Sequence, residues 1–195
     1  MQMYIIRHGQ TSWNLAKRKQ GHLDSPLTLK GIEQAKNTGN LILSEGLDLK
    51  NIKIVTSPLF RAKQHASILC ETINYDFNSC IIEEGLKEHC FGSWEGKTEQ
   101  EIEEKFPGFL SNRYKPENYW SYIIPMGESY ELLYRRVSDV IEKYGTKDII
   151  YICHEMVSKV MVGKLKNLEP EQILPLSHPQ DQIYKYKNKS IYTLK

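Results

Sequence analysis

Residues 149–154 read Ile-Ile-Tyr-Ile-Cys-His, and this stretch decides the fold class of the chain. Its first five residues form an uninterrupted apolar run, which is typical of a strand buried on both faces inside a parallel sheet. A helical pattern of apolar residues precedes the run at Leu133, Val137, Val140, Ile141 and Tyr144, and a second one follows it at Val157, Val160, Met161 and Leu165. A buried strand between two amphipathic helices predicts an α/β fold.

The same alternation is present in the N-terminal half. Residues 3–6 and 52–56 are short apolar runs of strand type, and helical patterns follow at residues 32–43 and 62–73. Ser57 and Pro58 predict the N-cap and the first position of the second of these helices. Strands that alternate with helices predict a single domain over residues 1–195, with a three-layer α/β/α architecture and a mostly parallel sheet.

Two further segments complete this architecture. Residues 183–186 and 191–194 predict a hairpin at the edge of the sheet. Residues 97–126 are polar and aromatic, contain three prolines and do not repeat the strand-helix rhythm. We therefore expect them to form a short lid or substrate wall over one end of the sheet.

Composition excludes several classes of partner. The 195 residues are 40% hydrophobic and 26% charged, with a formal net charge of +2 and basic residues scattered along the chain, so we expect no nucleic-acid partner. The apolar runs are far shorter than the roughly 20 residues that cross a bilayer, and no leader-like segment opens the sequence, so we expect a cytoplasmic protein without a membrane partner. The four cysteines form no CxxC pair, and we expect neither a disulfide nor a zinc site. Nothing in the sequence indicates an oligomeric state.

Reactive side chains follow each of the three best strands. Arg7 and His8 follow the first, Ser57 and Arg61 follow the second, and His154 follows the strand that ends at residue 153. In open α/β sheets the ligand crevice lies at the carboxyl ends of the strands, so these side chains are predicted to converge. Arginine binds phosphate in a bidentate manner, and the first turn of the helix that carries Arg61 favours anions. The set predicts a phosphate pocket.

The two histidines indicate which reaction this pocket can carry out. A neutral His8 imidazole can attack phosphorus if its other nitrogen is held by a hydrogen bond, and His154 can donate to a phosphoryl oxygen. The leaving group then needs a proton from a general acid. Glu88 is the candidate, because apolar and aromatic neighbours raise the pKa of a carboxyl group. Glu84 and Glu95 compete with it, and these physical arguments do not choose among the three.

The remaining histidines and the basic segment after Asn14 receive structural assignments. His65 falls within a predicted helix and His178 stands beside Pro179, and nothing in the sequence converges on either. His22 can line the entrance of the pocket. Residues 17–19, Lys-Arg-Lys, are typical of a solvated face, although they can also steer anionic substrates toward the crevice.

At this point the sequence resembles the histidine phosphatase superfamily, in its phosphoglycerate-mutase-like branch of small phosphatases. The resemblance covers nearly the whole chain and rests on six segments in the order of the family: residues 7–14 (Arg-His-Gly-Gln-Thr-Ser-Trp-Asn), 20–28, 56–62, 88–96 and 125–129, and His154 after its strand. A lone Arg-His-Gly tripeptide arises by chance, whereas six ordered segments are specific.

The resemblance implies roles for individual residues. It implies that His8 is phosphorylated and that Glu88, rather than Glu84 or Glu95, is the proton donor. It also implies that the phosphoryl group is held by Arg7, Asn14, Arg61 and His154. Gln20 is implied to lie near the substrate. Neither a metal nor a cofactor is implied.

Two positions depart from the family pattern. Glu155 follows His154 where the family commonly has glycine, and Gln10 stands where a glutamate is frequent. A carboxylate at position 155 suits the start of a helix but can crowd or repel an anionic substrate. Neither change removes a catalytic group, so the departures bear on substrate preference.

Three functions are compared on this basis. The first is a metal-independent phosphomonoesterase that acts on small phosphorylated metabolites. The alternative is a phosphoglycerate mutase, but mutases carry longer insertions, and here the excursion holds a single arginine, Arg113, before the turn at Gly127. A non-catalytic regulatory relative would be expected to lose His8 or Glu88, and both are present. The sequence favours the phosphatase.

Overall fold

A six-stranded, mostly parallel sheet forms the centre of the protein in the computed structural model, which describes residues 2–113, 115, 118, 120–145 and 148–195. The strand order is β3-β2-β4-β1-β5-β6. The strands are β1 (Gln2–Arg7), β2 (Lys53–Thr56), β3 (Ile81–Ile82), β4 (Ile149–Cys153), β5 (Ile183–Lys187) and β6 (Ser190–Leu194). The first four strands pair in parallel, and β4 lies between β1 and β2. The run at residues 149–153 is therefore an interior strand, as its composition predicts.

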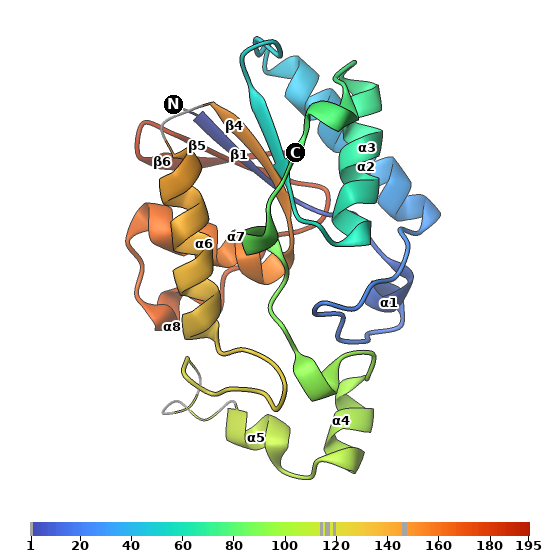
Figure 1. Ribbon diagram of the computed structural model, residues 1–195, viewed down its shortest axis with the longest axis vertical. Coiled ribbons are helices and arrows are strands. Elements are labelled where there is room, and N and C mark those ends of the chain that lie inside the picture. The colour runs from blue at the N-terminus through green and yellow to red at the C-terminus, as the bar shows by residue number, and fades with distance from the viewer. Residues whose placement is uncertain (1, 114, 116–117, 119, 146–147) are drawn as a thin grey trace.

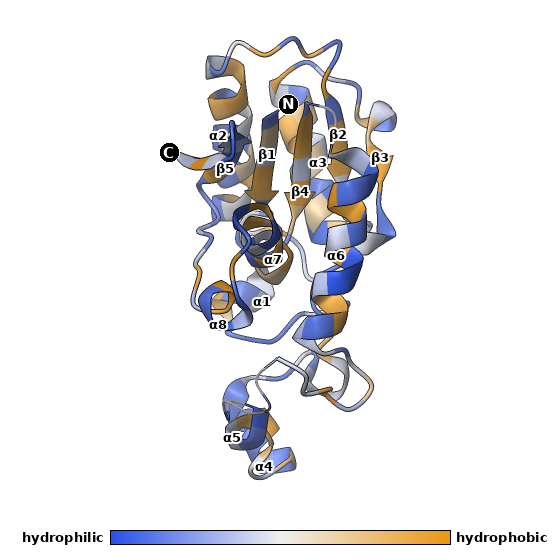
Figure 2. Cartoon of the chain, turned by 90° about the vertical axis from the view of Figure 1, so that its left-hand side faces the viewer, coloured by the Kyte–Doolittle hydropathy of each residue, from blue (hydrophilic) through white to orange (hydrophobic). Residues whose placement is uncertain are grey.

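Helices cover both faces of this sheet (Figures 1 and 2). Met3 and Ile5 of β1 pack in one core cluster with α6 (Tyr130–Tyr144), α7 (Glu155–Lys166) and α8 (Pro170–Ile173). Tyr4 and Ile6, which point to the opposite face, pack with α2 (Leu29–Ser44) and α3 (Phe60–Thr72). Successive strand side chains alternate between faces, and burial of both faces explains why the strands are apolar throughout. The predicted three-layer architecture is confirmed.

The predicted edge hairpin is also confirmed. β5 pairs antiparallel with both β1 and β6, and β6 is the edge strand. Asn188 and Lys189 connect the two strands with φ values of 51° and 62°. Two consecutive left-handed residues form the tight turn whose twist matches that of a two-stranded hairpin.

The start predicted for α3 is wrong. The helix begins at Phe60 rather than at Pro58, and its N-cap is Leu59, which makes no side-chain cap. The Ser57 hydroxyl accepts from the Leu59 N–H (3.3 Å) and lies 2.7 Å from His154 Nε2, so it does not cap the first turn of the helix. Asp24 instead accepts hydrogen bonds from the backbone N–H groups of Phe60 (2.7 Å) and Arg61 (3.2 Å). A carboxylate 36 residues away thus caps this helix, and local sequence signals do not reveal it.

The excursion forms a small unit set apart from the sheet, at the lower end of Figures 1 and 2. It contains α4 (Glu99–Lys105) and α5 (Phe109–Arg113), which lie around a separate cluster of Trp94, Ile102 and Ile124. Residues 114, 116–117 and 119 of the predicted lid lie outside the described residues. Shorter elements elsewhere are α1 (Ser12–Leu15) and single helical turns at Phe77–Ser79, Glu84–Leu86 and Gly92–Trp94.

Two sequence expectations concern the chain as a whole. Within the described residues, no helix combines the length and the apolar character that crossing a membrane requires. The four cysteines are free thiols. The Sγ atoms of Cys70 and Cys80 lie 3.5 Å apart, a proximity that their spacing in the sequence does not indicate.

Candidate active site

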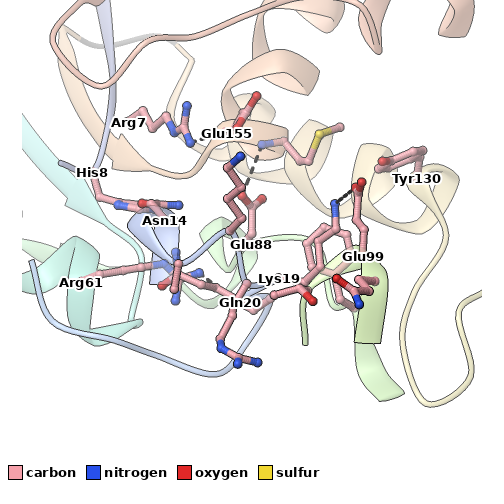
Figure 3. Close-up of a pocket in the computed structure, with 18 residues that line it drawn as sticks. Arg7, His8, Asn14, Lys19, Gln20, Arg61, Glu88, Glu99, Tyr130 and Glu155 are labelled. Carbon is pink, nitrogen blue, oxygen red and sulfur yellow. Dashed lines mark hydrogen bonds and ion pairs between the residues drawn. The ribbon is translucent and has the colours of Figure 1, made fainter. Parts of the chain in front are cut away.

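A cavity of about 730 Å³ opens where the carboxyl ends of β1 and β4 meet the excursion (Figure 3). Six of the seven residues predicted for catalysis or phosphate binding line it, and His154 is the exception; the six are Arg7, His8, Asn14, Gln20, Arg61 and Glu88. In Figure 3, Arg7, His8, Asn14 and Arg61 lie at one side, with Glu99 and Tyr130 at the other. Thr98, Glu99 and Gln100, at the start of α4, belong to the wall, so the excursion borders the cavity.

Sheet topology brings the reactive segments together. The His8 N–H donates to the Cys153 carbonyl (3.0 Å), and the Ser57 N–H donates to the Ile152 carbonyl (3.0 Å). These two hydrogen bonds extend the pairing of β4 with β1 and with β2 by one residue past the ends of β1 and β2. Because β4 is the middle strand of the three, the segments that follow all three strands are placed side by side.

His8 is held by one ring nitrogen. Its Nδ1–H donates to the Gly9 carbonyl at 2.8 Å, and the side chain is 3% exposed. Since a carbonyl only accepts, a neutral ring must carry its proton on Nδ1, which leaves the Nε2 lone pair free. Burial and the nearby Arg61 and Arg7 guanidinium groups lower the pKa of His8 well below its ordinary value. The neutral, Nδ1-protonated imidazole is therefore the favoured form.

Two guanidinium groups flank His8 but are already partly engaged. Arg7 donates from Nη1 to the His178 carbonyl (2.9 Å), and its Nη2 lies 2.9 Å from Glu155 Oε2. Arg61 is fully buried. It pairs with Asp24 (2.7 Å) and donates to the carbonyls of Gly21 and Leu23, in the loop that contains Asp24. The Nε atoms of both arginines are buried and have no hydrogen-bond partner among the described residues. These two N–H groups are therefore buried donors without a partner, which is rare in folded proteins.

The two amide side chains of the site are fixed by their oxygens. Asn14 Oδ1 accepts from the Thr11 N–H (3.1 Å) and from Gln180 Nε2 (2.9 Å), so its amide nitrogen stays available to a ligand. Gln20 Oε1 accepts from the Ser25 hydroxyl at 3.0 Å. Both side chains are therefore oriented before any ligand arrives.

His154 lies behind the cavity rather than in its wall. It is fully buried, its Nε2 lies 2.7 Å from Ser57 Oγ, and its ring meets that of His8 edge to face with centroids 5.1 Å apart. Burial, followed by the charge of Arg61, lowers the pKa of His154 well below its ordinary value. Its Nδ1 has no hydrogen-bond partner among the described residues.

Glu88 is one of the glutamates that line the cavity, together with Glu99 and Glu155. It is 8% exposed, and its oxygens accept from the backbone N–H groups of His89 (2.9 Å) and Met156 (3.4 Å). Burial raises the pKa of Glu88 and outweighs the backbone hydrogen bond that lowers it. This environment shifts Glu88 toward the protonated form that a general acid needs.

The two competing carboxylates have other surroundings. Glu84 is largely exposed and pairs with Lys87. Glu95 accepts from three backbone N–H groups, those of His22, Leu23 and Phe91. Glu95 therefore ties the loop around residue 22 to the segment that follows Glu88, and neither carboxylate lines the cavity.

Sequence reasoning missed the support of Glu88. Arg136 on α6 donates to the carbonyls of Gly85, Lys87 and Glu88 at 2.6 to 2.9 Å, and it forms an ion pair with Glu128. The turn at Gly127 and Glu128 could have been found from the sequence, because it belongs to one of the family segments. The role of Arg136 could not, since an arginine on an amphipathic helix ordinarily faces solvent.

Glu155 lines the cavity beside Arg7 (Figure 3). Its carboxylate forms ion pairs with Arg7 (2.9 Å) and Lys159 (3.2 Å). Burial alone would raise the pKa of Glu155, but these two cations outweigh it and the pKa lies below its ordinary value. Glu155 is thus ionised and occupies one edge of Arg7.

Ion pairs also bridge the rim of the cavity. Lys19 meets Glu99 at 2.8 Å, and Arg18 meets Glu101 at 2.6 Å, so the segment after Asn14 is tied to α4. Both side chains are partly exposed, in keeping with the expectation of a solvated face, and they also line the cavity.

The expectation that nothing converges on His65 is also wrong. The Gly9 N–H donates to His65 Nδ1 at 3.0 Å, and Thr38 Oγ1 lies 3.0 Å from its Nε2. His178, for its part, supplies the carbonyl that accepts from Arg7, and its ring stacks on Tyr184.

Among the residues that the structure describes, no group of three or more His, Cys, Asp or Glu side chains is placed to hold a metal ion.

Known proteins resemble the chain over most of its length. A family profile described as Histidine phosphatase superfamily (branch 1) matches residues 3–190. The Bacillus subtilis (strain 168) protein named uncharacterized phosphatase PhoE is 29% identical over 168 residues, which are 86% of this chain and 78% of that protein. The Escherichia coli (strain K12) adenosylcobalamin/alpha-ribazole phosphatase is 28% identical over 182 residues, 88% of this chain and 82% of the relative. The crystal structure of the alpha-ribazole phosphatase from Shigella flexneri superposes with a TM-score of 0.82 at 25% identity and covers 98% of this chain and 93% of that one.

Proposed function

This chain belongs to branch 1 of the histidine phosphatase superfamily, and from that premise we propose that it is a phosphomonoesterase with a phosphohistidine intermediate at His8. The observation that carries the proposal is the state of the His8 ring. Its Nδ1–H is held by the Gly9 carbonyl, and its Nε2 is free in a cavity lined by Arg7 and Arg61. A neutral imidazole with one nitrogen anchored is a competent nucleophile toward phosphorus.

The first step transfers the phosphoryl group. His8 Nε2 forms a bond to phosphorus, the ester P–O bond breaks, and Glu88 gives its proton to the departing oxygen. Arg7 and Arg61 then bind the negative oxygens, with the Asn14 amide as a further donor. The presence of both arginines in the lining of the cavity, beside His8, supports this assignment.

The second step releases phosphate. Glu88, now ionised, takes a proton from a water molecule that attacks phosphorus, and the bond from phosphorus to His8 Nε2 breaks. The raised pKa of Glu88 supports this double use, since the group must hold a proton in one step and remove one in the next. His154, which does not line the cavity, is proposed to support the His8 ring from behind through the edge-to-face contact of the two rings.

A phosphoglycerate mutase would need cations in the outer cavity to clamp the carboxylate of its substrate. Arg113, the arginine of the excursion, is 1% exposed, with its guanidinium 4.4 Å from the ring centroid of Tyr130, and it does not line the cavity. Lys19 and Arg18 are paired with carboxylates of the excursion. These contacts favour hydrolysis over mutase action.

The substrate is proposed to be a small phosphorylated metabolite, and the excursion over residues 97–126 is proposed as the wall that selects its leaving group. A cavity of about 730 Å³ exceeds what a bare phosphate needs and accommodates a sugar- or nucleoside-sized group. Because two of the similar proteins are named alpha-ribazole phosphatases, alpha-ribazole phosphate is the first compound to assay.

A panel of phosphorylated metabolites tests the proposal when released phosphate and isomerised product are measured together. We expect phosphate release that persists with a chelator and is lost in His8→Ala, and acid-labile, base-stable phosphoprotein in quenched turnover. Isomerised product without phosphate would assign a mutase instead. Loss of turnover with the chelator would contradict the metal-independent mechanism.

A further inference from the structure

Two thiols lie side by side next to the edge strand β3. Cys70 is in the last turn of α3 and Cys80 directly precedes β3, and their Sγ atoms are 3.5 Å apart. We propose that Cys70 and Cys80 are a redox-active pair, which a hydroperoxide converts into a reversible disulfide between α3 and the edge strand. The pair is separate from the proposed function, since neither cysteine lines the cavity of the candidate active site.

Main-chain hydrogen bonds hold both cysteines in place. The Cys70 carbonyl accepts from the Tyr75 N–H (2.9 Å), just past the end of α3. The Cys80 N–H donates to the Phe77 carbonyl (3.0 Å), and the next residue begins β3, which pairs with β2. A disulfide needs an S–S distance of about 2.05 Å, so the two sulfurs must approach by about 1.5 Å, and rotation of the side chains about their Cα–Cβ bonds can supply this movement.

The two thiols differ in exposure and in acidity. Cys70 is 1% exposed, whereas Cys80 is half-buried. A hydrogen bond from the Cys70 thiol to the Cys80 sulfur lowers the pKa of Cys80 and raises the pKa of Cys70. The thiolate is the reactive form of cysteine. Cys80 is therefore the sulfur that an oxidant reaches first, and Cys70 lies behind it as the second partner.

Oxidation of this pair takes two steps. The Cys80 thiolate attacks an oxygen of the hydroperoxide, the O–O bond breaks, and the departing oxygen leaves as water or an alcohol with the proton that Cys80 has lost. The Cys70 sulfur then attacks the sulfur of the Cys80 sulfenic acid, the S–O bond breaks, and the hydroxide leaves as water with the Cys70 proton. Two thiols are oxidised and one peroxide is reduced.

The other two cysteines have different surroundings. Cys90 Sγ lies 3.6 Å from Glu95 Oε1, and burial, together with the charge of Glu95, raises the pKa of Cys90. Cys153 is fully buried in β4, and burial raises its pKa too. Because both remain thiols near neutral pH, the oxidant should act on Cys80 before either of them.

Mass spectrometry of the wild-type protein after treatment with hydrogen peroxide tests the pair. Trypsin leaves both cysteines in one peptide, residues 64–87, because positions 64–86 contain no lysine or arginine. We expect this peptide to lose the mass of two hydrogens and to regain it with dithiothreitol. Chymotrypsin, which cleaves after Tyr75 and Phe77, should leave fragments that only the disulfide joins.

Cys80→Ser should abolish the crosslink, and Cys90→Ser, the matched control, should keep it. The disulfide joins residues 10 positions apart, so the oxidised wild-type protein should melt about 5 °C above the reduced one, with no such difference in Cys80→Ser. If Cys80→Ser does not fold, Cys70→Ala supplies the same comparison.

Three results would overturn the inference. One is a sulfenic or sulfinic acid at Cys80 with no crosslink, which would mean that the two thiols are only packed together. Another is a disulfide that contains Cys90 or Cys153. The third is an equal Tm for the oxidised and reduced proteins, which would mean that the bond does not fasten α3 to the edge strand. None of these results depends on phosphatase activity, so the pair and the proposed function succeed or fail separately.

Discussion

Glu155→Gln is expected to tighten the binding of inorganic phosphate, the product of the proposed reaction. Glu155 is ionised, forms a 2.9 Å ion pair with Arg7 and faces the side of the cavity where a phosphoryl group would bind. A phosphate ion on the opposite edge of the same guanidinium meets this carboxylate as a like charge. Glutamine keeps the shape of the side chain and removes the charge.

The size of the effect follows from Coulomb's law. Two negative charges that flank one guanidinium group lie roughly 7 Å apart, and at an effective dielectric constant of about 20 they repel by about 2 kcal/mol. The Glu155 side chain is 36% exposed, and solvent screening reduces the repulsion to roughly half, about 1 kcal/mol. The inhibition constant for phosphate should therefore fall about fivefold in Glu155→Gln.

Competitive inhibition by phosphate against an aryl ester, at two salt concentrations, measures this change. Glu99→Gln is the control, because Glu99 also lines the cavity but pairs with Lys19 at its rim. We expect a smaller change for Glu99→Gln, and we expect the effect of Glu155→Gln to shrink as salt rises. Equal phosphate affinity in Glu155→Gln and the wild-type protein would refute the reasoning.

Three further predictions concern the acid, the helix cap and the pH dependence of stability. Glu88→Gln should lower kcat on an alkyl phosphate by about 10² to 10⁴ and lower it less on an aryl phosphate with an acidic leaving group; equal losses on both esters would argue against a general acid. Asp24→Ala removes both the cap of α3 and the partner of buried Arg61, and should lower the free energy of unfolding in urea by roughly 2 to 3 kcal/mol. His65 stays neutral in the folded protein with a pKa of about 3, so below about pH 6.5 the unfolded chain binds a proton that the folded one does not. Its contribution to stability should fall by about 2 kcal/mol from pH 7 to pH 5, and His65→Asn should lose this pH dependence in urea titrations at the two pH values.

The sequence alone determined the architecture and the members of the site that follow strands. Periodicity is a local property, so the apolar run at residues 149–153 indicated a buried parallel strand, and the flanking patterns indicated helices on both of its faces. The carboxyl ends of parallel strands meet at one edge of the sheet, so the order of the elements was enough to predict that Arg7, His8 and Arg61 converge. The family segments added Asn14 and Glu88, whose roles remain proposals.

Only the tertiary structure decided how these side chains are held. Asp24 caps a helix far along the chain, Arg136 binds the carbonyls around Glu88, and His65 reaches the Gly9 peptide from a different helix of the fold. Each of these three side chains binds a backbone group. Because every residue has such groups, the sequence does not indicate which side chain will bind a given one. Long-range hydrogen bonds to the main chain depend on how the sheet and helices pack. The residues that follow the strands could therefore be predicted from their types and spacing, and Asn14 and Glu88 from the family resemblance, while the orientations of these side chains follow from the packing.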